Sequence, residues 1–103
     1  MIVRIIRGKL RPGTWEAYEA AYKAVLAEHG RFKGLVSRWL VRDTVDRDAG
    51  YSISLWADEA SMKAYESSDT LKNIINPKLQ PFFSGEYTTT HCEMRSHENF
   101  SLG

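Results

Sequence analysis

The sequence predicts an α+β fold in which two helices cover one face of a four-stranded antiparallel sheet. Strand-like runs of β-branched and aromatic residues alternate along the chain with segments of helical periodicity. A polar turn over residues 46–50 joins two neighbouring strand-like runs, which is typical of a hairpin. The resulting order, β-α-β-β-α-β with the second helix broken in two, is the ferredoxin-like order.

The first strand and the first helix have clear sequence boundaries. Residues 2–10 are rich in β-branched side chains, and Pro12-Gly13 marks their end. Thr14 is the predicted N-cap of the helix, and Glu16 lies in its first turn, where the helix dipole favours an anion. Large side chains at spacings of three and four predict the buried stripe of this helix: Trp15, Tyr18, Tyr22, Val25 and Leu26.

The first helix is expected to end at His29-Gly30, with Gly30 as a left-handed C-terminal cap. Residues 35–43 form the predicted second strand, and residues 51–56 form the third. Asp58 follows the third strand directly and is the expected N-cap of the second helix.

The second helix is predicted to end near Ser67, and a short third helix capped by Ser68 or Asp69 follows it. Pro77 and Pro81 are expected to force an irregular stretch after this third helix. The last strand is predicted from about residue 86 to 95. Residues 1–95 then form a single domain, and residues 96–103 form a loose or partner-bound C-terminal tail.

Composition excludes several classes of protein. The 103 residues include 43% hydrophobic and 26% charged side chains, which is ordinary for a globular domain. A formal net charge of +1 gives no reason to expect nucleic acid. One cysteine cannot form an intramolecular disulfide, and no apolar run approaches the roughly 20 residues of a membrane helix. Without a signal-peptide pattern, a cytoplasmic protein that binds no membrane is the expectation.

The third predicted strand has two different faces. Alternation places Tyr51, Ile53 and Leu55 on one side, and the other side is formed by Ser52, Ser54 and Trp56. Two small hydroxyl side chains beside an indole, next to a helix start, indicate space beneath the helices. We therefore expect a ligand pocket between the helices and the sheet.

The opposite sheet face is also apolar, because the first two strands have no purely polar side. Residues 2–7 alternate isoleucine, valine and arginine on both faces, and Trp39 and Val41 lie opposite Leu40 in the second strand. An exposed apolar sheet would aggregate as a monomer, so a second copy packing sheet to sheet is expected. The predicted partner is thus a second copy of the chain in a homodimer.

Several motifs resemble the antibiotic biosynthesis monooxygenase family of dimeric α/β barrels. They are the Pro-Gly-x-Trp-Glu segment at residues 12–16, Gly34 before the second strand, and Leu-Trp-Ala-Asp-Glu-Ala at residues 55–60. A tyrosine and Ser-Ser-Asp then follow the second helix, so the resemblance spans roughly residues 1–95. It implies a homodimeric barrel and, in one branch, oxidation of phenolic compounds without metal or flavin.

The resemblance can be compared with this chain residue by residue. The heme-degrading branch has an asparagine, a tryptophan and a histidine where this chain has Ile6, Tyr65 and Ile75, so heme is not expected as a cofactor. The phenol-oxidising branch pairs an asparagine with a tryptophan. This chain keeps the tryptophan as Trp56 but has Ser52 in place of the asparagine. Ser54 stands where quinol-oxidising relatives have an acidic residue, and their helix-two histidine is absent.

The candidate site follows from these residues. A phenolate can give an electron to dioxygen directly, so the protein need only bind, deprotonate and shelter the substrate. His91 is the predicted catalytic base, with His29 as a second candidate. The predicted substrate-binding residues for a small aromatic molecule are Trp56, Tyr65, Tyr22, Ser52, Ser54 and Trp39. The structural alternative is that these aromatic residues fill the core and that the histidine is merely exposed.

Other groupings of polar residues are not expected to form sites. His91, Cys92, Glu93 and His97 are close in sequence, but alternation sends Cys92 to the opposite face, so no metal site is predicted. The sheet arginines are expected at solvated edges or in ion pairs across the dimer rather than in an anion site: Arg4, Arg7, Arg38 and Arg42.

Two functions remain open at this point. The first is a small cofactor-independent monooxygenase that acts on an aromatic or quinol-like metabolite. The second is a non-catalytic dimeric barrel that binds a small apolar ligand or a protein partner. The missing asparagine and histidine favour the second, and the serine-tryptophan face of residues 52–56 fits both.

Overall fold

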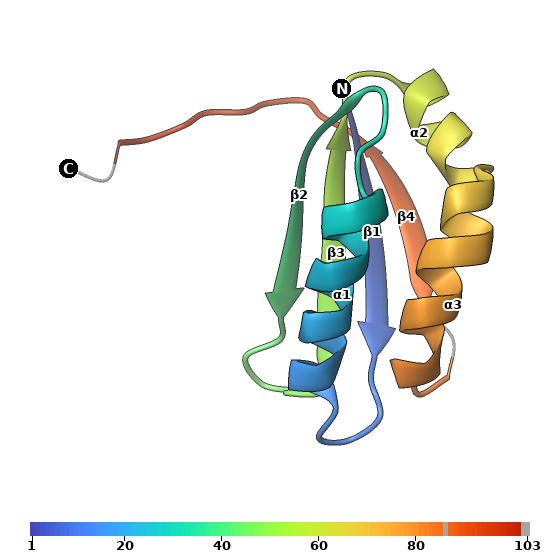
Figure 1. Ribbon diagram of the computed structural model, residues 1–103. Helices are drawn as coiled ribbons and strands as arrows, with labels where there is room; N and C mark the ends of the chain where they lie inside the picture. The colour runs from blue at the N-terminus through green and yellow to red at the C-terminus, as the bar shows by residue number, and fades with distance from the viewer. Residues whose placement is uncertain (86, 102–103) are drawn as a thin grey trace.

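The computed structural model describes residues 1–85 and 87–101, and it confirms the predicted α+β fold. A four-stranded antiparallel sheet has the order β2-β3-β1-β4, and the helices lie together on one side of it (Figure 1). The strands are β1 (Ile2–Lys9), β2 (Leu35–Arg42), β3 (Ala49–Trp56) and β4 (Thr88–Glu93). The helical segments are α1 (Trp15–His29), α2 (Glu59–Glu66), the π-helical turn η1 (Leu71–Ile75), α3 (Asn76–Leu79) and the 3₁₀ turn η2 (Gln80–Phe82).

Helix α1 packs on the sheet through the predicted stripe. All five of its large stripe residues are buried, as expected from their spacing: Trp15, Tyr18, Tyr22, Val25 and Leu26. The N-cap prediction is wrong in one respect. Thr14 occupies the cap position, but its hydroxyl donates a hydrogen bond to the carbonyl of Arg11 instead of accepting one from the helix.

Gly30 ends helix α1, but not for the predicted reason. Its φ of −92° is outside the left-handed region, so the conformational freedom of glycine is not what the position needs. A Cβ atom there would lie only 2.6 and 2.7 Å from the two terminal guanidinium nitrogens of Arg38. The Cβ would lie closer still to the backbone carbonyl oxygen of Leu26, which cannot move aside as a side chain can, so the end of the helix leaves no room for a side chain at Gly30.

The segment after α2 is helical for longer than the sequence suggested. Asp58 caps α2 as predicted, since its carboxylate accepts a 2.7 Å hydrogen bond from the amide of Ser61. Ser68 caps the next segment by accepting from the amide of Leu71. The predicted irregular stretch at Pro77 and Pro81 is wrong, because each proline lies in the first turn of a short helix, where its missing amide hydrogen costs no bond.

The two ends of the helix-covered face are packed differently. At one end Gly8 pairs with Gly50, and their missing side chains let Phe83 and Trp15 lie directly on the sheet. At the other end, Ser52 and then Ser54 follow on the same face of β3. The aromatic contacts close the glycine end, while the serines leave room at their own end.

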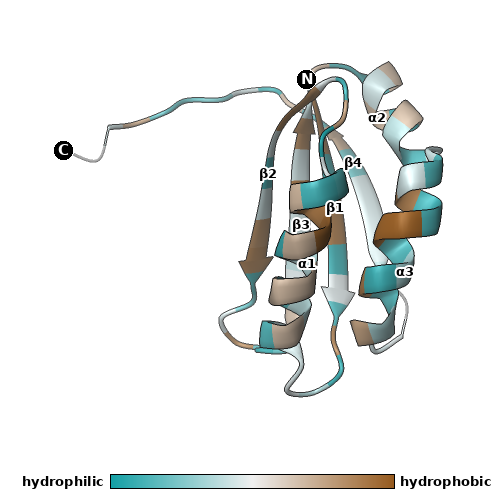
Figure 2. Ribbon diagram, in the orientation of Figure 1, coloured by the Kyte–Doolittle hydropathy of each residue, from teal (hydrophilic) through white to brown (hydrophobic). Residues whose placement is uncertain are grey.

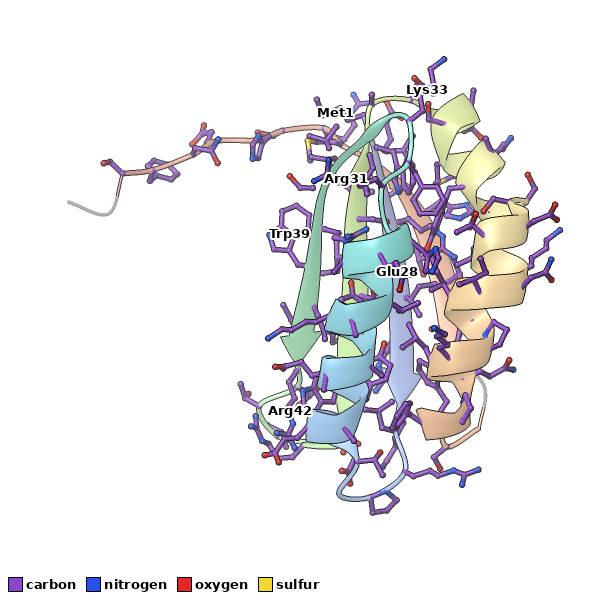
Figure 3. The ribbon with its side chains drawn as sticks, viewed as in Figure 1. Met1, Glu28, Arg31, Lys33, Trp39 and Arg42 are labelled. Atoms are coloured by element: carbon purple, nitrogen blue, oxygen red, sulfur yellow. The ribbon has the colours of Figure 1, made fainter. Side chains whose placement is uncertain are left out.

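The other sheet face is open and apolar. Trp39 is 47% exposed and Val41 41%, and Ile5 and Ile53 lie in register with Trp39. Figure 2 shows hydrophobic segments in β1 and β2 and a paler β4, all six residues of which are exposed. Figure 3 shows Trp39 pointing away from α1.

The described part of the C-terminal tail leaves the sheet after β4 and contains no helix or strand (Figure 1). None of the helices among the described residues is long and apolar enough to cross a membrane.

Candidate functional site

A cavity of about 90 Å³ lies between the helices and the serine-bearing end of the sheet. Its walls come from β1, β2, β3, α1, α2 and the 71–83 segment. Five of the predicted substrate-binding residues line it together: Tyr22, Ser52, Ser54, Trp56 and Tyr65. The volume exceeds what one water needs, so a small organic group has space to enter.

The two serines form the floor of the cavity, and each is held by an aromatic neighbour. The indole Nε1–H of Trp56 donates a 2.9 Å hydrogen bond to the hydroxyl of Ser54. The hydroxyls of Tyr22 and Ser52 lie 3.3 Å apart and share a hydrogen bond. Since a serine hydroxyl also carries a donor hydrogen, Ser54 can accept from Trp56 and still donate to a ligand.

An aromatic cluster forms one wall of the cavity. The ring centroid of Tyr65 lies 4.9 Å from that of Trp56 and 4.6 Å from that of Phe32. The sequence does not identify Phe32 as a site residue, because it lies in the turn between Gly30 and Gly34, where no periodicity marks it. Trp56 is only 1% exposed, so its ring is a fixed wall and not a mobile flap.

Four polar side chains form one row across the helix-covered face of the sheet. Arg4 of β1 is in register with Ser54 of β3 and with His91 of β4, and Ser54 is in register with Arg38 of β2. Arg4 and Arg38 both line the cavity. These two arginines therefore do not lie at solvated edges, which was one of the two placements expected for the sheet arginines, the other being ion pairs across the dimer.

Arg4 and His91 share the carboxylate of Glu66, which extends from the end of α2. The same oxygen, Oε2, lies 2.7 Å from Nε of Arg4 and 2.9 Å from Nε2 of His91. Partial burial works in the opposite direction, but these two hydrogen bonds hold the pKa of Glu66 below its usual value. The guanidinium of Arg4 also lies 5.2 Å from the ring centroid of Tyr65, a cation–π contact.

Burial raises the pKa of Tyr65 despite the nearby charge of Arg4, and it raises that of Tyr18 further. Both tyrosines are thus neutral phenols near pH 7. They can donate hydrogen bonds into the cavity but are not general bases.

Three predicted candidates lie outside the cavity. Trp39 is on the opposite, open face of the sheet and does not line it. His91 is on the helix-covered face but also does not line it, and it reaches the site through Glu66 and Arg4. The second candidate base, His29, lies at the end of α1 near Glu28 and is outside the cavity too.

The lining residues offer little to a metal or a heme. Within the described ranges, no group of three or more His, Cys, Asp or Glu side chains lies close enough to hold a metal ion. Ile6, Tyr65 and Ile75 do line the cavity, at the positions compared with the heme-degrading branch. The side chain of Ile75 has no donor atom for iron where that branch has a histidine.

Solved structures share this fold at low sequence identity. SnoaB from Streptomyces nogalater, described as a cofactor-independent oxygenase, is 14% identical with a TM-score of 0.77, over 93% of this chain and 94% of that one. A conserved protein from Methanosarcina mazei Go1 is 17% identical with a TM-score of 0.76, over 92% and 94% of the two chains. Rv0793 from Mycobacterium tuberculosis is 14% identical with a TM-score of 0.75, over 95% and 98%.

No protein with curated annotation matches the chain significantly in sequence. The sequence model of the family described as antibiotic biosynthesis monooxygenase matches residues 1–76, which include β1 to β3, α1, α2 and most of the cavity floor. The chain therefore belongs to the antibiotic biosynthesis monooxygenase family.

Proposed function

We propose that the protein is a small cofactor-independent monooxygenase that acts on an aromatic or quinol-like metabolite. One observation carries the proposal, namely the aromatic cavity whose floor carries the hydroxyls of Ser52 and Ser54, with Ser54 in register between Arg4 and Arg38. Such a cavity can hold a flat ring against Trp56 and Tyr65 and can orient its hydroxyl groups by hydrogen bonds. Membership of the antibiotic biosynthesis monooxygenase family supports the proposed monooxygenase function.

The chemistry places few demands on the protein. A deprotonated dihydroxyarene can pass an electron to dioxygen, and the two radicals can recombine at a ring carbon. Loss of water from the resulting hydroperoxide then gives a hydroxyquinone. One dihydroxyarene and one dioxygen thus yield one hydroxyquinone and one water, with no cofactor consumed.

The proton leaves the substrate at the β4 side of the cavity in this proposal. The Glu66–His91 pair is adjacent to Arg4, and a substrate hydroxyl that extends past Arg4 meets it. Arg4 stabilises the phenolate that forms, and His91 accepts the proton as the general base. The hydrogen bond to Glu66 orients the imidazole and stabilises its charged form.

We also propose a homodimer that buries the open sheet face. The exposed Trp39 and Val41, together with Ile5 and Ile53 in register, form an apolar surface of the kind that a partner covers. The chain's second copy is the simplest partner, because the same surface can meet itself about a two-fold axis. Trp39 then has a role in assembly and not in substrate binding.

The test is oxygen uptake with a panel of dihydroxybenzenes and dihydroxynaphthalenes. We expect one dioxygen consumed per hydroxyquinone formed, without hydrogen peroxide, which uncatalysed autoxidation would release. His91→Ala should lower the rate by roughly a hundred-fold, in the range typical of a lost general base. Trp56→Ala should raise KM, and Trp39→Ala should leave the chemistry of the subunit unchanged. Equal turnover in the wild type, His91→Ala and Trp56→Ala would overturn the site.

A second function is favoured by the residues at positions 52 and 54. Ser52 and Ser54 replace the asparagine and the acidic residue of catalytic relatives, and both hydroxyls already have partners. A barrel that binds a small apolar ligand or a protein partner without chemistry would need only the cavity. Saturable binding of the aromatic panel with no oxygen uptake would support this second function over the first.

A further inference from the structure

We propose that the cavity selects aromatic substrates that carry a carboxylate, and that Arg38 binds this carboxylate. The inference rests on the proposed function for the location of the site, and it adds the class of substrate. Two arginines, Arg4 and Arg38, line the cavity, and their hydrogen-bond partners differ.

Arg38 is held in place by backbone carbonyls at the end of α1. One terminal nitrogen donates to the carbonyl of Gly30, and the other lies 3.4 Å from that of Leu26. Among the residues that the structure describes, no carboxylate forms an ion pair with Arg38. A guanidinium has five N–H donors, so several remain for a ligand.

Among the described residues, the two arginines of the cavity therefore differ in charge balance. Arg4 is neutralised by Glu66 at 2.7 Å, whereas the described residues that line the cavity include no Asp or Glu to balance Arg38. A partly buried cation without a counter-ion favours an anionic ligand over a neutral one of the same shape. The planar fork of arginine matches a carboxylate in particular, because both can form two parallel hydrogen bonds.

The spacing of the row fits a ring with groups at both ends. Arg4 and Arg38 lie on strands that flank β3, so their backbones are roughly 10 Å apart, twice the strand spacing. Ser54 lies between them on the cavity floor. A substrate with its carboxylate at Arg38 would place a hydroxyl near Ser54 and Arg4, beside the Glu66–His91 pair.

The experiment compares three probes by calorimetry without oxygen: 2,5-dihydroxybenzoate, its methyl ester and 1,4-dihydroxybenzene. The wild type should bind the acid about ten- to a hundred-fold more tightly than the ester, as expected for a charge-assisted hydrogen-bond pair. Arg38→Gln should reduce this acid-to-ester ratio to about one, and Arg38→Lys should leave an intermediate ratio. Arg42→Gln is the matched control, because Arg42 lies on the same strand and face but outside the cavity and should keep the wild-type ratio.

A structural role of Arg38 as a cap for α1 would give a different result. Loss of the cap lowers the unfolding temperature of Arg38→Gln but leaves the acid-to-ester ratio of the folded protein unchanged. An acid-to-ester ratio near one in the wild type, or a ratio that Arg38→Gln does not change, would overturn the inference. If Arg38→Gln does not fold, the acid-to-ester ratios of the wild type and of Arg38→Lys test the inference instead.

The outcomes also separate this inference from the proposed function. Selective binding of the acid without oxygen uptake would retain the carboxylate site and reject the monooxygenase. Oxygen uptake at equal rates with the acid and the ester would retain the monooxygenase and reject the carboxylate site. Failure of all three probes to bind would overturn the carboxylate site.

Discussion

Replacing Glu66 by glutamine tests the polar network beside the cavity. The carboxylate accepts hydrogen bonds from Arg4 at 2.7 Å and from His91 at 2.9 Å, and the side chains of Arg4 and Glu66 are only 13% and 26% exposed. Charge-assisted bonds at buried sites contribute about 1.5–3 kcal/mol, and exposed ion pairs contribute about 0–1 kcal/mol. For this partly buried pair we expect Glu66→Gln to lower the free energy of unfolding by about 1–2 kcal/mol at pH 7.

The loss should depend on pH in a defined direction. The pKa of Glu66 is lower in the folded protein than its ordinary value of 4.5, so its ionised form stabilises the fold. This contribution is complete above the unfolded pKa and disappears as the pH falls through the folded pKa. The difference between wild type and Glu66→Gln should therefore be largest at neutral pH and should shrink below about pH 4.

Urea denaturation of both proteins across this pH range measures the difference. Glu59→Gln is the matched control on the same helix, because the Glu59–Lys63 pair is exposed and should contribute less than about 0.5 kcal/mol. A difference between wild type and Glu66→Gln that stays constant from pH 7 to about pH 3 would refute the electrostatic reasoning. A difference no larger than that of Glu59→Gln would refute the assigned strength of the network.

Three further predictions concern the fold and its assembly. Gly34→Ala should destabilise the protein by about 1–3 kcal/mol, because Gly34 has a left-handed φ of +84° and an added Cβ would meet Ser61. Thermal unfolding measures this loss, and an unchanged melting temperature would contradict it. Asp58→Ala should cost about 1 kcal/mol by removing the cap of α2, and Asp58→Asn should restore most of it. Trp39→Glu should convert the proposed dimer to a monomer in sedimentation at micromolar concentration, and a monomeric wild type would reject the dimer.

Much of the architecture could be predicted because local patterns determine it. The stripe of α1 and the alternation of residues 51–56 each point large side chains toward one face, and the fold preserves both patterns. The serine floor beside Trp56 could be predicted for the same reason, since strand geometry alone puts these side chains together.

The charged part of the site could not be predicted in this way. Alternation placed Arg4 and Arg38 on a sheet face, but whether that face holds a cavity or meets solvent depends on how the helices pack. Glu66 reaches Arg4 from 62 positions along the chain, and no local spacing signals such a contact. The prediction at Pro77 is wrong for a related reason. Proline is unfavourable in the interior of a helix but is tolerated in the first turn of a new helical segment, which is where Pro77 lies.

The most direct test of the central claim is nuclear magnetic resonance of the three tryptophan indoles during titration with 1,4-dihydroxybenzene without oxygen. If a ring enters the space between helices and sheet, the Nε1–H signal of Trp56 shifts saturably, because this group bonds to Ser54 on the cavity floor. The signal of Trp39, on the far side of the sheet, should stay in place. A Trp56 signal that does not move at saturating probe, or a shift confined to Trp39, would contradict the account.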